Sequence, residues 1–304
     1  MSEIGSDQPV VGIVGLGSMG FGMGQSLLRA GLVTYGHDVD PGRVAALQTD
    51  GAGAGTLPEH AGELDILVLV VVNAAQVDDV LFGRDGLAAK LKAGAVVVGC
   101  PTVAPEYARS LGKRLKEMGL LYLDAPISGG AVRAAEGKLT MMCSGEPAAF
   151  AAARPALDAM CETLFELGDA PGPGSAMKIV NQLLAGVHIA AAAEAITFGV
   201  SQGIDPAKTV EVISKSAGSS WMFQNRGPHI VEGDYTPRSA VSIFVKDLGI
   251  VTDVGRSSHF ATPLAATALQ QFLAADGSGL GKEDDAAVAK VYARNAGLKL
   301  PGMD

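Results

Sequence analysis

Short, unbroken apolar runs alternate with helical stretches through the first half of the chain. The runs LDILVLVVV at 64–72 and AGAVVVGC at 93–100 are typical of central strands in a parallel sheet, because such strands are buried on both faces. Each run is followed by a helical stretch, which is the order of elements that builds a doubly wound α/β sheet. The full set of predicted strands is 10–14, 32–36, 64–72, 93–100, a run ending at Asp124, 139–143 and 163–167.

A glycine- and proline-rich segment, GDAPGPGSA at 168–176, separates this pattern from a second half that has few strand-like runs. Because Gly and Pro interrupt regular structure, we place a domain boundary here, between residues 1–170 and residues 171–304. The segment 218–236, which contains the only tryptophan, indicates an ordered loop or a short-helix region. Helices are predicted at 147–160, 206–215, 244–257, 263–275 and 284–294.

One long helix at 174–203 joins the two halves, because this stretch is rich in Ala, Leu, Ile and Val and contains no proline. Lys178 lies near its start, and Asn181 and Gln182 follow at helical spacing, so the three polar side chains share roughly one face. A lysine in the first turns can extend its amine to solvent. The alternative is a partly desolvated amine that serves proton transfer.

The glycines of VVGIVGLGSMG stand between a predicted strand and a predicted helix, where a dinucleotide-binding fingerprint belongs. Gly15 allows the tight turn, Gly17 lets the backbone approach a pyrophosphate, and Gly20 lets the helix pack closely on the strand. Ser18 and Met19 lie in the same turn. The predicted fold class is therefore α/β, with an N-terminal Rossmann-type doubly wound sheet and an all-helical C-terminal domain joined to it by the long helix.

A carboxylate stands about 20 residues beyond the glycines, at the end of the second predicted strand, where it can accept hydrogen bonds from an adenosine ribose. We assign this role to Asp38, and Asp40 is the neighbouring alternative. In the interpretation without a ligand, Asp38 is a solvated residue of a turn. The negative charge of Asp38 repels a 2′-phosphate, and no Arg or Lys immediately follows it. NAD is therefore the expected cofactor.

Polar residues also follow other strands of the predicted sheet, and ligands of open α/β sheets bind beyond the carboxyl ends of strands. Asn73 and Thr102 are such residues. The loop Ser128-Gly129-Gly130 offers one hydroxyl and two unencumbered backbone amides, which suits a carboxylate, although the same residues also make an ordinary turn.

Composition and charge argue against nucleic-acid-binding, metal-binding and membrane-spanning classes of protein. A net charge of -9 argues against a nucleic-acid surface. Three widely spaced cysteines and five histidines without ligand spacing favour reduced thiols in the cytoplasm and no metal site. Residues 1–9 show no secretory signal. Polar residues of the long helix argue against a membrane span; these are Asn181, Gln182, His188 and Glu194.

Four motifs in this order resemble those of the 3-hydroxyacid dehydrogenase family, which includes 3-hydroxyisobutyrate dehydrogenase and tartronate semialdehyde reductase. The motifs are GLGSMGFGM at 15–23, DAPISGG at 124–130, GSAMKIVNQ at 174–182 and KDL at 246–248. The resemblance covers nearly the whole chain and implies an NAD-dependent oxidation of a small hydroxy acid.

The resemblance also implies roles for single residues. It makes Lys178 the catalytic acid and base and places the substrate carboxylate on Ser128, Gly129 and Gly130. Asn181 orients the substrate beside Gln182, while Thr102 and Lys246 contact the cofactor or the substrate. This chain has Gln182 where most relatives have Asn, and Cys100-Pro101 before Thr102 where they have Ser or Thr. These departures leave the chemistry intact but question a standard 3-hydroxyisobutyrate substrate.

Within the family, the segment 223–249 is most similar to a subgroup that oxidises the C2 hydroxyl of a four-carbon sugar acid. Arg226 and His229 in this segment are candidates for contacts with distal hydroxyls. The alternatives are 3-hydroxyisobutyrate, D-glycerate or tartronate semialdehyde as substrate, an NADP-linked reductase, and a catalytically silent NAD-binding protein. The apolar long helix is hard to cover within one small domain, so we expect a homodimer or homotetramer.

Overall fold

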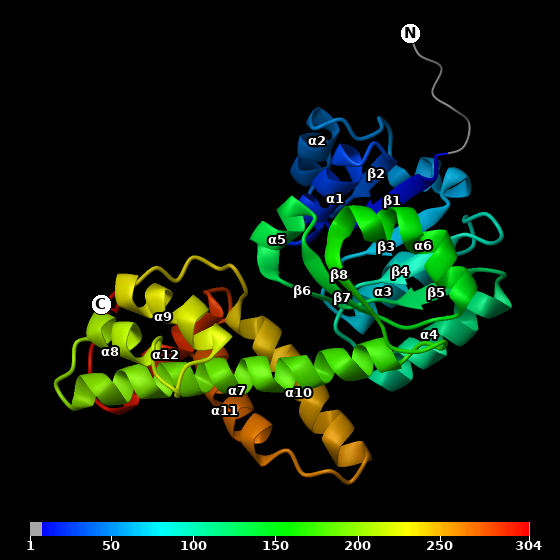
Figure 1. The fold of residues 1–304 in the computed structure, drawn as a ribbon. Helices are drawn as coiled ribbons and strands as arrows, with labels where there is room; N and C mark the ends of the chain where they lie inside the picture. Colours follow the sequence, from blue (N-terminus) through cyan, green and yellow to red (C-terminus); the bar gives the residue numbers. More distant parts are fainter. Residues whose placement is uncertain (1–7, 304) are drawn as a thin grey trace. The chain divides into compact units, whose positions relative to one another are not determined.

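The computed structural model of the chain describes residues 8–303, which form two compact units (Figure 1). One unit ends at Lys178 and the other begins at Ile179, inside helix α7 (Pro173–Ser201). The predicted domain boundary between residues 170 and 171 stays a prediction. Residues 1–7, which make up most of the segment in which we expect no secretory signal, lie outside the described residues.

The first unit is built on a five-stranded parallel sheet with the strand order β2-β1-β3-β4-β5. The strands are β1 (Val10–Val14), β2 (Val33–His37), β3 (Ile66–Leu69), β4 (Val96–Gly99) and β5 (Leu121–Asp124). Strand β3 is shorter than the apolar run that predicts it. Leu69 pairs with Val14 and with Gly99, and both neighbouring strands end at these residues. The regular ladder therefore ends at Leu69, although the N–H of Val70 still donates to the carbonyl oxygen of Val14 at 2.8 Å.

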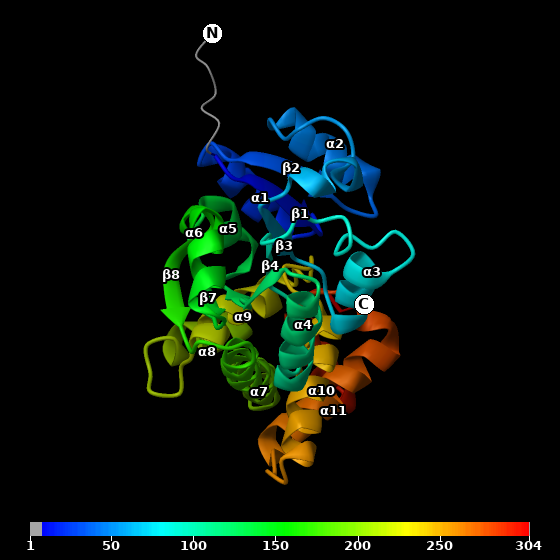
Figure 2. The same cartoon turned by 90° about the vertical axis from the view of Figure 1, so that its right-hand side faces the viewer.

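Helices cover both faces of this sheet (Figure 2). Because side chains alternate along a strand, Ile66 and Val68 of β3 enter one apolar core, and Leu67 and Leu69 enter the other. The first core takes side chains from α1 (Gly20–Arg29), α2 (Pro41–Thr49), α5 (Gly130–Glu136) and α6 (Pro147–Met160). The second takes them from α3 (Ala74–Phe82) and α4 (Pro105–Glu117).

A second, three-stranded sheet lies in the same unit, with the order β6-β7-β8. It consists of β6 (Ile127–Ser128), β7 (Leu139–Cys143) and β8 (Cys161–Glu166). Strand β6 pairs antiparallel with β7, and this pairing sets Ser128 opposite Thr140. A strand of two residues leaves no periodic pattern in the sequence, so only β7 and β8 were predictable.

The second unit is helical, and Ile179–Ser201 of α7 is its longest element. Its core joins Ile189 and Ile196 of α7 to Phe244, Leu248 and Phe272. The other helices are α8 (Pro206–Ile213), α9 (Trp221–Glu232), α10 (Val241–Ser257), α11 (Pro263–Ala275) and α12 (Val288–Asn295). The region at 218–236 thus contains a full helix, although Pro228 lies inside it.

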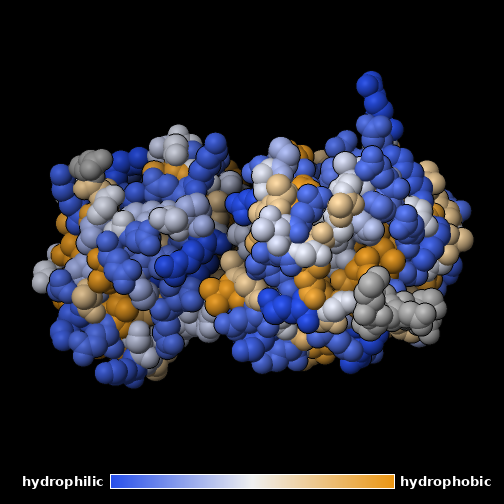
Figure 3. Space-filling view, turned by 90° about the horizontal axis from the view of Figure 1, so that it is seen from above, coloured by the Kyte–Doolittle hydropathy of each residue, from blue (hydrophilic) through white to orange (hydrophobic). Residues whose placement is uncertain are grey.

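Helix α7 is long and apolar enough to cross a membrane by length and composition alone, with a mean hydropathy of 1.7 over 18 residues. The polar residues cited above therefore do not exclude a span by themselves. Half of that window is buried inside the protein, as in the core helix of a soluble protein, which passes the same test. Hydrophilic residues dominate the face shown in Figure 3, where apolar residues form small scattered groups.

Candidate active site

The glycine turn between β1 and α1 has the geometry expected of a phosphate-binding loop. Gly15 has a φ of +92°, and a Cβ there would lie 2.6 Å from the carbonyl oxygen of Val70. A Cβ on Gly20 would overlap the carbonyl oxygen of Gly15. No atom lies within 4 Å of a Cβ built on Gly17. The fold itself therefore requires glycine at positions 15 and 20. Gly17 faces open space, which a pyrophosphate needs in order to approach the backbone closely.

Asp38 is tied directly to this turn. One carboxylate oxygen accepts a hydrogen bond from the backbone N–H of Leu16 at 2.6 Å, and the other accepts one from Asp40 at 2.9 Å. Asp40 itself caps α2, where its side chain accepts from the N–H of Gly42 at 2.9 Å. Because Asp38 bonds to the glycine turn and Asp40 bonds to the start of α2, the geometry favours Asp38 as the carboxylate next to a ribose.

The strand order reverses between β1 and β3, which marks the switch point where open α/β sheets bind ligands. Asn73 follows β3 and caps α3, accepting from the N–H of Gln76 at 2.9 Å. Thr102 follows β4 and is buried. Asn73 thus lies beyond the carboxyl end of β3, which pairs with β1, and Thr102 lies beyond that of β4, the next strand in the sheet. Their contacts with a cofactor stay a prediction.

The predicted carboxylate cradle runs from β6 into α5. Ser128 closes β6, and Gly129 and Gly130 have φ values of +136° and +80°. These conformations favour glycine and turn successive backbone amides in directions that ordinary strand geometry does not allow. Ser128 and Gly129 are half-buried, and Gly130 is exposed. The loop can therefore present a hydroxyl and backbone N–H groups to an anion.

Lys178 lies in the second turn of α7 and is only 7% exposed. Asn181 follows three residues later on the same helix, so both side chains lie on one face. A lysine residue that is this buried does not match one whose side chain extends into solvent. The burial favours the proton-transfer interpretation.

A chain of polar contacts in the helical unit links α7 to α10. The amide of Asn181 donates to Gln182 at 2.8 Å, and Gln182 donates to Asp247 at 2.5 Å. The amine of Lys246 lies 2.9 Å from the other oxygen of Asp247, an ion-pair contact without hydrogen-bond alignment. Asp247 is 1% exposed and was not predicted as a site residue. Its place beside Lys246 in the KDL motif was the only signal for it in the sequence.

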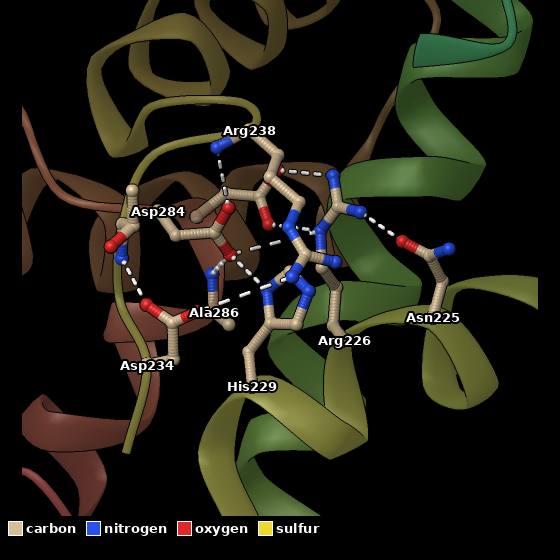
Figure 4. A network of polar contacts seen from close by, with 9 residues as sticks. Asn225, Arg226, His229, Asp234, Arg238, Asp284 and Ala286 are labelled. Atoms are coloured by element: carbon tan, nitrogen blue, oxygen red, sulfur yellow. Dashed lines mark hydrogen bonds and ion pairs between the residues drawn. The ribbon is translucent and has the colours of Figure 1, made fainter. Parts of the chain in front are cut away.

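Arg226 and His229 belong to a buried network in the same unit (Figure 4). Arg226 donates to both carboxylate oxygens of Asp285, at 2.5 and 2.9 Å, and His229 lies 2.9 Å from Asp284. Burial raises the pKa of Asp285, and the ion pair with Arg226 opposes that rise. The network gives both side chains a structural role. Their contacts with substrate hydroxyls stay a prediction.

No group of three or more His, Cys, Asp or Glu side chains within residues 8–303 is arranged to hold a metal ion. The three cysteines are free thiols, and burial raises the pKa of each, in the case of Cys161 to about 11. At neutral pH they are therefore protonated and weakly nucleophilic.

Comparisons with known families and proteins identify relatives of this chain. Residues 10–168 match the NAD binding domain of 6-phosphogluconate dehydrogenase, and residues 172–292 match the family described as NAD-binding of NADP-dependent 3-hydroxyisobutyrate dehydrogenase. An L-threonate dehydrogenase of Cupriavidus necator is 50% identical over 293 residues, which cover 96% of this chain and 98% of the relative. An L-threonate dehydrogenase of Escherichia coli is 49% identical over 297 residues, 96% of each chain.

The solved structure of a 3-hydroxyisobutyrate dehydrogenase from Salmonella typhimurium is 50% identical to this chain and gives a TM-score of 0.89. The alignment covers 93% of this chain and 100% of the chain in that structure. The predicted family, fold class and NAD cofactor are confirmed. The chain belongs to the 3-hydroxyisobutyrate dehydrogenase-like family of NAD-binding 3-hydroxyacid dehydrogenases and is an oxidoreductase.

Proposed function

We propose that this enzyme oxidises L-threonate at its C2 hydroxyl to 2-oxo-tetronate, with NAD as the cofactor. The main support is the relatives named L-threonate dehydrogenase, which are about half identical over nearly the whole chain. The sequence of 223–249 favours the same four-carbon sugar acid.

The geometry of the glycine turn and of Asp38 supports binding of NAD. Bound NAD supplies the hydride acceptor, and the open space at Gly17 beside the carboxylate of Asp38 suits its adenosine and pyrophosphate halves. The residues proposed to hold it are Gly15, Gly17, Ser18, Met19, Gly20, Asp38, Asn73, Thr102 and Lys246. The Asp38 charge favours NAD over NADP, since a 2′-phosphate would meet it directly.

Residues of the protein bind the substrate, orient it and transfer its proton. Ser128 and the amides of Gly129 and Gly130 hold the substrate carboxylate, and Asn181, steadied by Gln182, orients the carbinol. As the C–H hydride leaves and the carbonyl forms, the hydroxyl proton passes to the amine of Lys178. In the reverse direction, the ammonium returns that proton to the carbonyl oxygen. Lys246, which lies against Asp247, contributes a positive charge for substrate or cofactor.

A substrate panel tests this proposal. NADH formation at 340 nm is followed with L-threonate, D-threonate, 3-hydroxyisobutyrate and D-glycerate, each with NAD and with NADP. We expect the highest kcat/KM with L-threonate and NAD. A site that pairs the distal hydroxyls of its substrate rejects analogues that lack them by a large factor, on the order of 10⁴.

The panel also tests 3-hydroxyisobutyrate as the second candidate substrate. The solved structure that is 50% identical to this chain is named a 3-hydroxyisobutyrate dehydrogenase. Activity confined to the shorter acids would contradict L-threonate and retain the family chemistry. Absence of turnover with every acid, with NAD still bound, would favour a catalytically silent NAD-binding protein.

We further propose that a second copy of this chain covers one face of α7, in a cytoplasmic homodimer or homotetramer. Val180, Leu184 and Phe198 are 54%, 50% and 66% exposed, and their spacing puts them on one side of the helix. Exposed large apolar residues on one side of a long helix are typical of an interface.

We expect light scattering at micromolar concentration to give a dimer or tetramer mass, and Leu184→Glu to lower it, because a charge in an apolar interface is costly. The matched control is Met118→Glu, a similarly exposed apolar residue at the end of α4, which should leave the mass unchanged. A monomeric mass for the wild-type protein would contradict this proposal.

A further inference from the structure

Asp124, the last residue of β5, is a buried carboxylate that four groups from distant parts of the chain surround. One oxygen accepts from the hydroxyl of Ser175 at 2.6 Å. The other accepts from the backbone N–H of Ser175 at 2.8 Å, the N–H of Gly172 at 3.0 Å and the hydroxyl of Ser144 at 3.2 Å. Asp124 therefore fastens the end of β5 to the first turn of α7.

The contacts suit an ionised carboxylate. Two of the four donors are backbone N–H groups, which can only donate, and both point at the same oxygen. The carboxylate also lies at the N-terminus of α7, where the helix dipole favours negative charge. Burial raises the pKa of Asp124, and its hydrogen bonds from Ser175, Gly172 and Ser144 act in the opposite direction.

The first turn of α7 packs so closely against neighbouring backbone that Gly174 has no space for a side chain. A Cβ on Gly174 would lie 2.5 Å from the carbonyl oxygen of Met142 and 2.8 Å from that of Asp124. The N–H of Gly174 donates to the hydroxyl of Ser144 at 2.9 Å. Asp124 and Ser144 also exchange two backbone hydrogen bonds, at 3.0 and 2.8 Å. One junction thus joins β5, the end of β7 and α7.

The two ends of this junction carry the groups that the proposed reaction needs. Four residues after Asp124 the chain reaches Ser128, the hydroxyl of the carboxylate cradle. Ser175 precedes Lys178 by three residues in α7, so the two lie on one face of the helix. A movement of Asp124 relative to Ser175 therefore changes the distance between the cradle and the amine.

We propose that Asp124 is a positioning residue of this enzyme, which sets the Lys178 amine against the carboxylate cradle at Ser128 without touching the substrate. The proposal rests on the proposed roles of Lys178 and Ser128. A misplacement of about 1 Å far from the reacting atoms can lower turnover by about 10²-fold. A helix cap that served stability alone would not change turnover per folded enzyme.

The test compares Asp124→Asn and Ser175→Ala with wild type. Asparagine keeps the shape of the side chain, but it loses the charge and turns one acceptor into a donor. We expect kcat of Asp124→Asn to fall about 10²-fold, with KM for NAD within about two-fold of wild type. Ser175→Ala should show a smaller loss in the same direction. Turnover is expressed per NADH-binding site, titrated by fluorescence, so that unfolded protein does not count.

Asp205→Asn is the matched control, because Asp205 caps α8 through the N–H of Lys208 and that helix carries no proposed site residue. It should leave kcat unchanged. A kcat per site for Asp124→Asn within two-fold of wild type would overturn the positioning role, as would equal losses in Asp124→Asn and Asp205→Asn.

Amide hydrogen exchange gives a readout that is independent of the substrate. If Asp124→Asn does not fold, Ser175→Ala tests the proposal in its place. For this variant we expect faster exchange at 172–178, unchanged exchange at 206–213, and a reduced kcat per site. Unchanged exchange and unchanged kcat per site would overturn the proposal. If no hydroxy acid of the panel is turned over by wild type, the proposed function fails, while the exchange measurement still reports whether Asp124 and Ser175 hold the start of α7.

Discussion

Replacing Lys178 with alanine is expected to lower kcat by about 10²- to 10⁴-fold, the range that general acid and base groups contribute. Lys178 is 7% exposed, and its place in the second turn of α7 puts it one turn after Ser175. Without the amine, the hydroxyl proton has no acceptor at the moment the hydride leaves. The affinity for NADH, measured by fluorescence titration, should stay within about two-fold of wild type, because the proposed dinucleotide contacts come mainly from other residues.

Lys178→Met is a second variant, since it retains the length and apolar body of the side chain and removes only the charge and the proton acceptor. It should lose as much turnover as the alanine variant. The control is Lys208→Ala, an exposed lysine on α8 that pairs with Glu211 at 2.6 Å, and it should leave kcat unchanged. Near-normal turnover of Lys178→Met would remove Lys178 from the chemistry.

Much of the fold could be predicted from the sequence because its signals are local. Helices α6 and α11 match the predicted ranges, and each begins at a proline, which suits the first helical position. Strand β7 also matches its apolar run. The region 218–236, predicted as an ordered loop or a short-helix region, contains the 12-residue helix α9, which continues through Pro228. The seven-residue α5 and the two-residue β6 are too short to show periodicity.

The sequence also predicts part of the candidate site, whose roles stay a prediction. The glycine turn and Asp38 follow from motif spacing, and the structure separates Asp38 from Asp40 by their hydrogen bonds. Asp124 and Asp247 stand in the motifs DAPISGG and KDL, but neither motif indicates which groups these carboxylates bind. Their partners stand far away in the sequence, 51 residues for Ser175 and 65 for Gln182. Contacts of this range appear only once the elements have packed, so a single sequence cannot indicate them.

The glycine turn yields a second large effect, because its glycines serve different purposes. For Gly17→Ala, we expect the affinity for NAD to fall by about 5- to 150-fold, which corresponds to about 1–3 kcal/mol of steric conflict. The free energy of unfolding of the protein without cofactor should barely change, since no atom lies within 4 Å of the added Cβ. The measurements are NADH fluorescence titration and thermal unfolding with and without NADH.

Gly20→Ala is the matched comparison, and it should behave in the opposite way. Its Cβ would overlap the carbonyl oxygen of Gly15 and lie 3.2 Å from the Cβ of Val70, so the turn must shift even without a ligand. We expect a lower Tm in the protein without cofactor, by about 2–4 °C for each kcal/mol lost. If Gly17→Ala also lowered that Tm, or bound NADH as wild type does, the open space at Gly17 would not be the pyrophosphate site. The Tm without cofactor thus identifies the glycine that the fold requires, and NADH binding identifies the glycine that the cofactor requires.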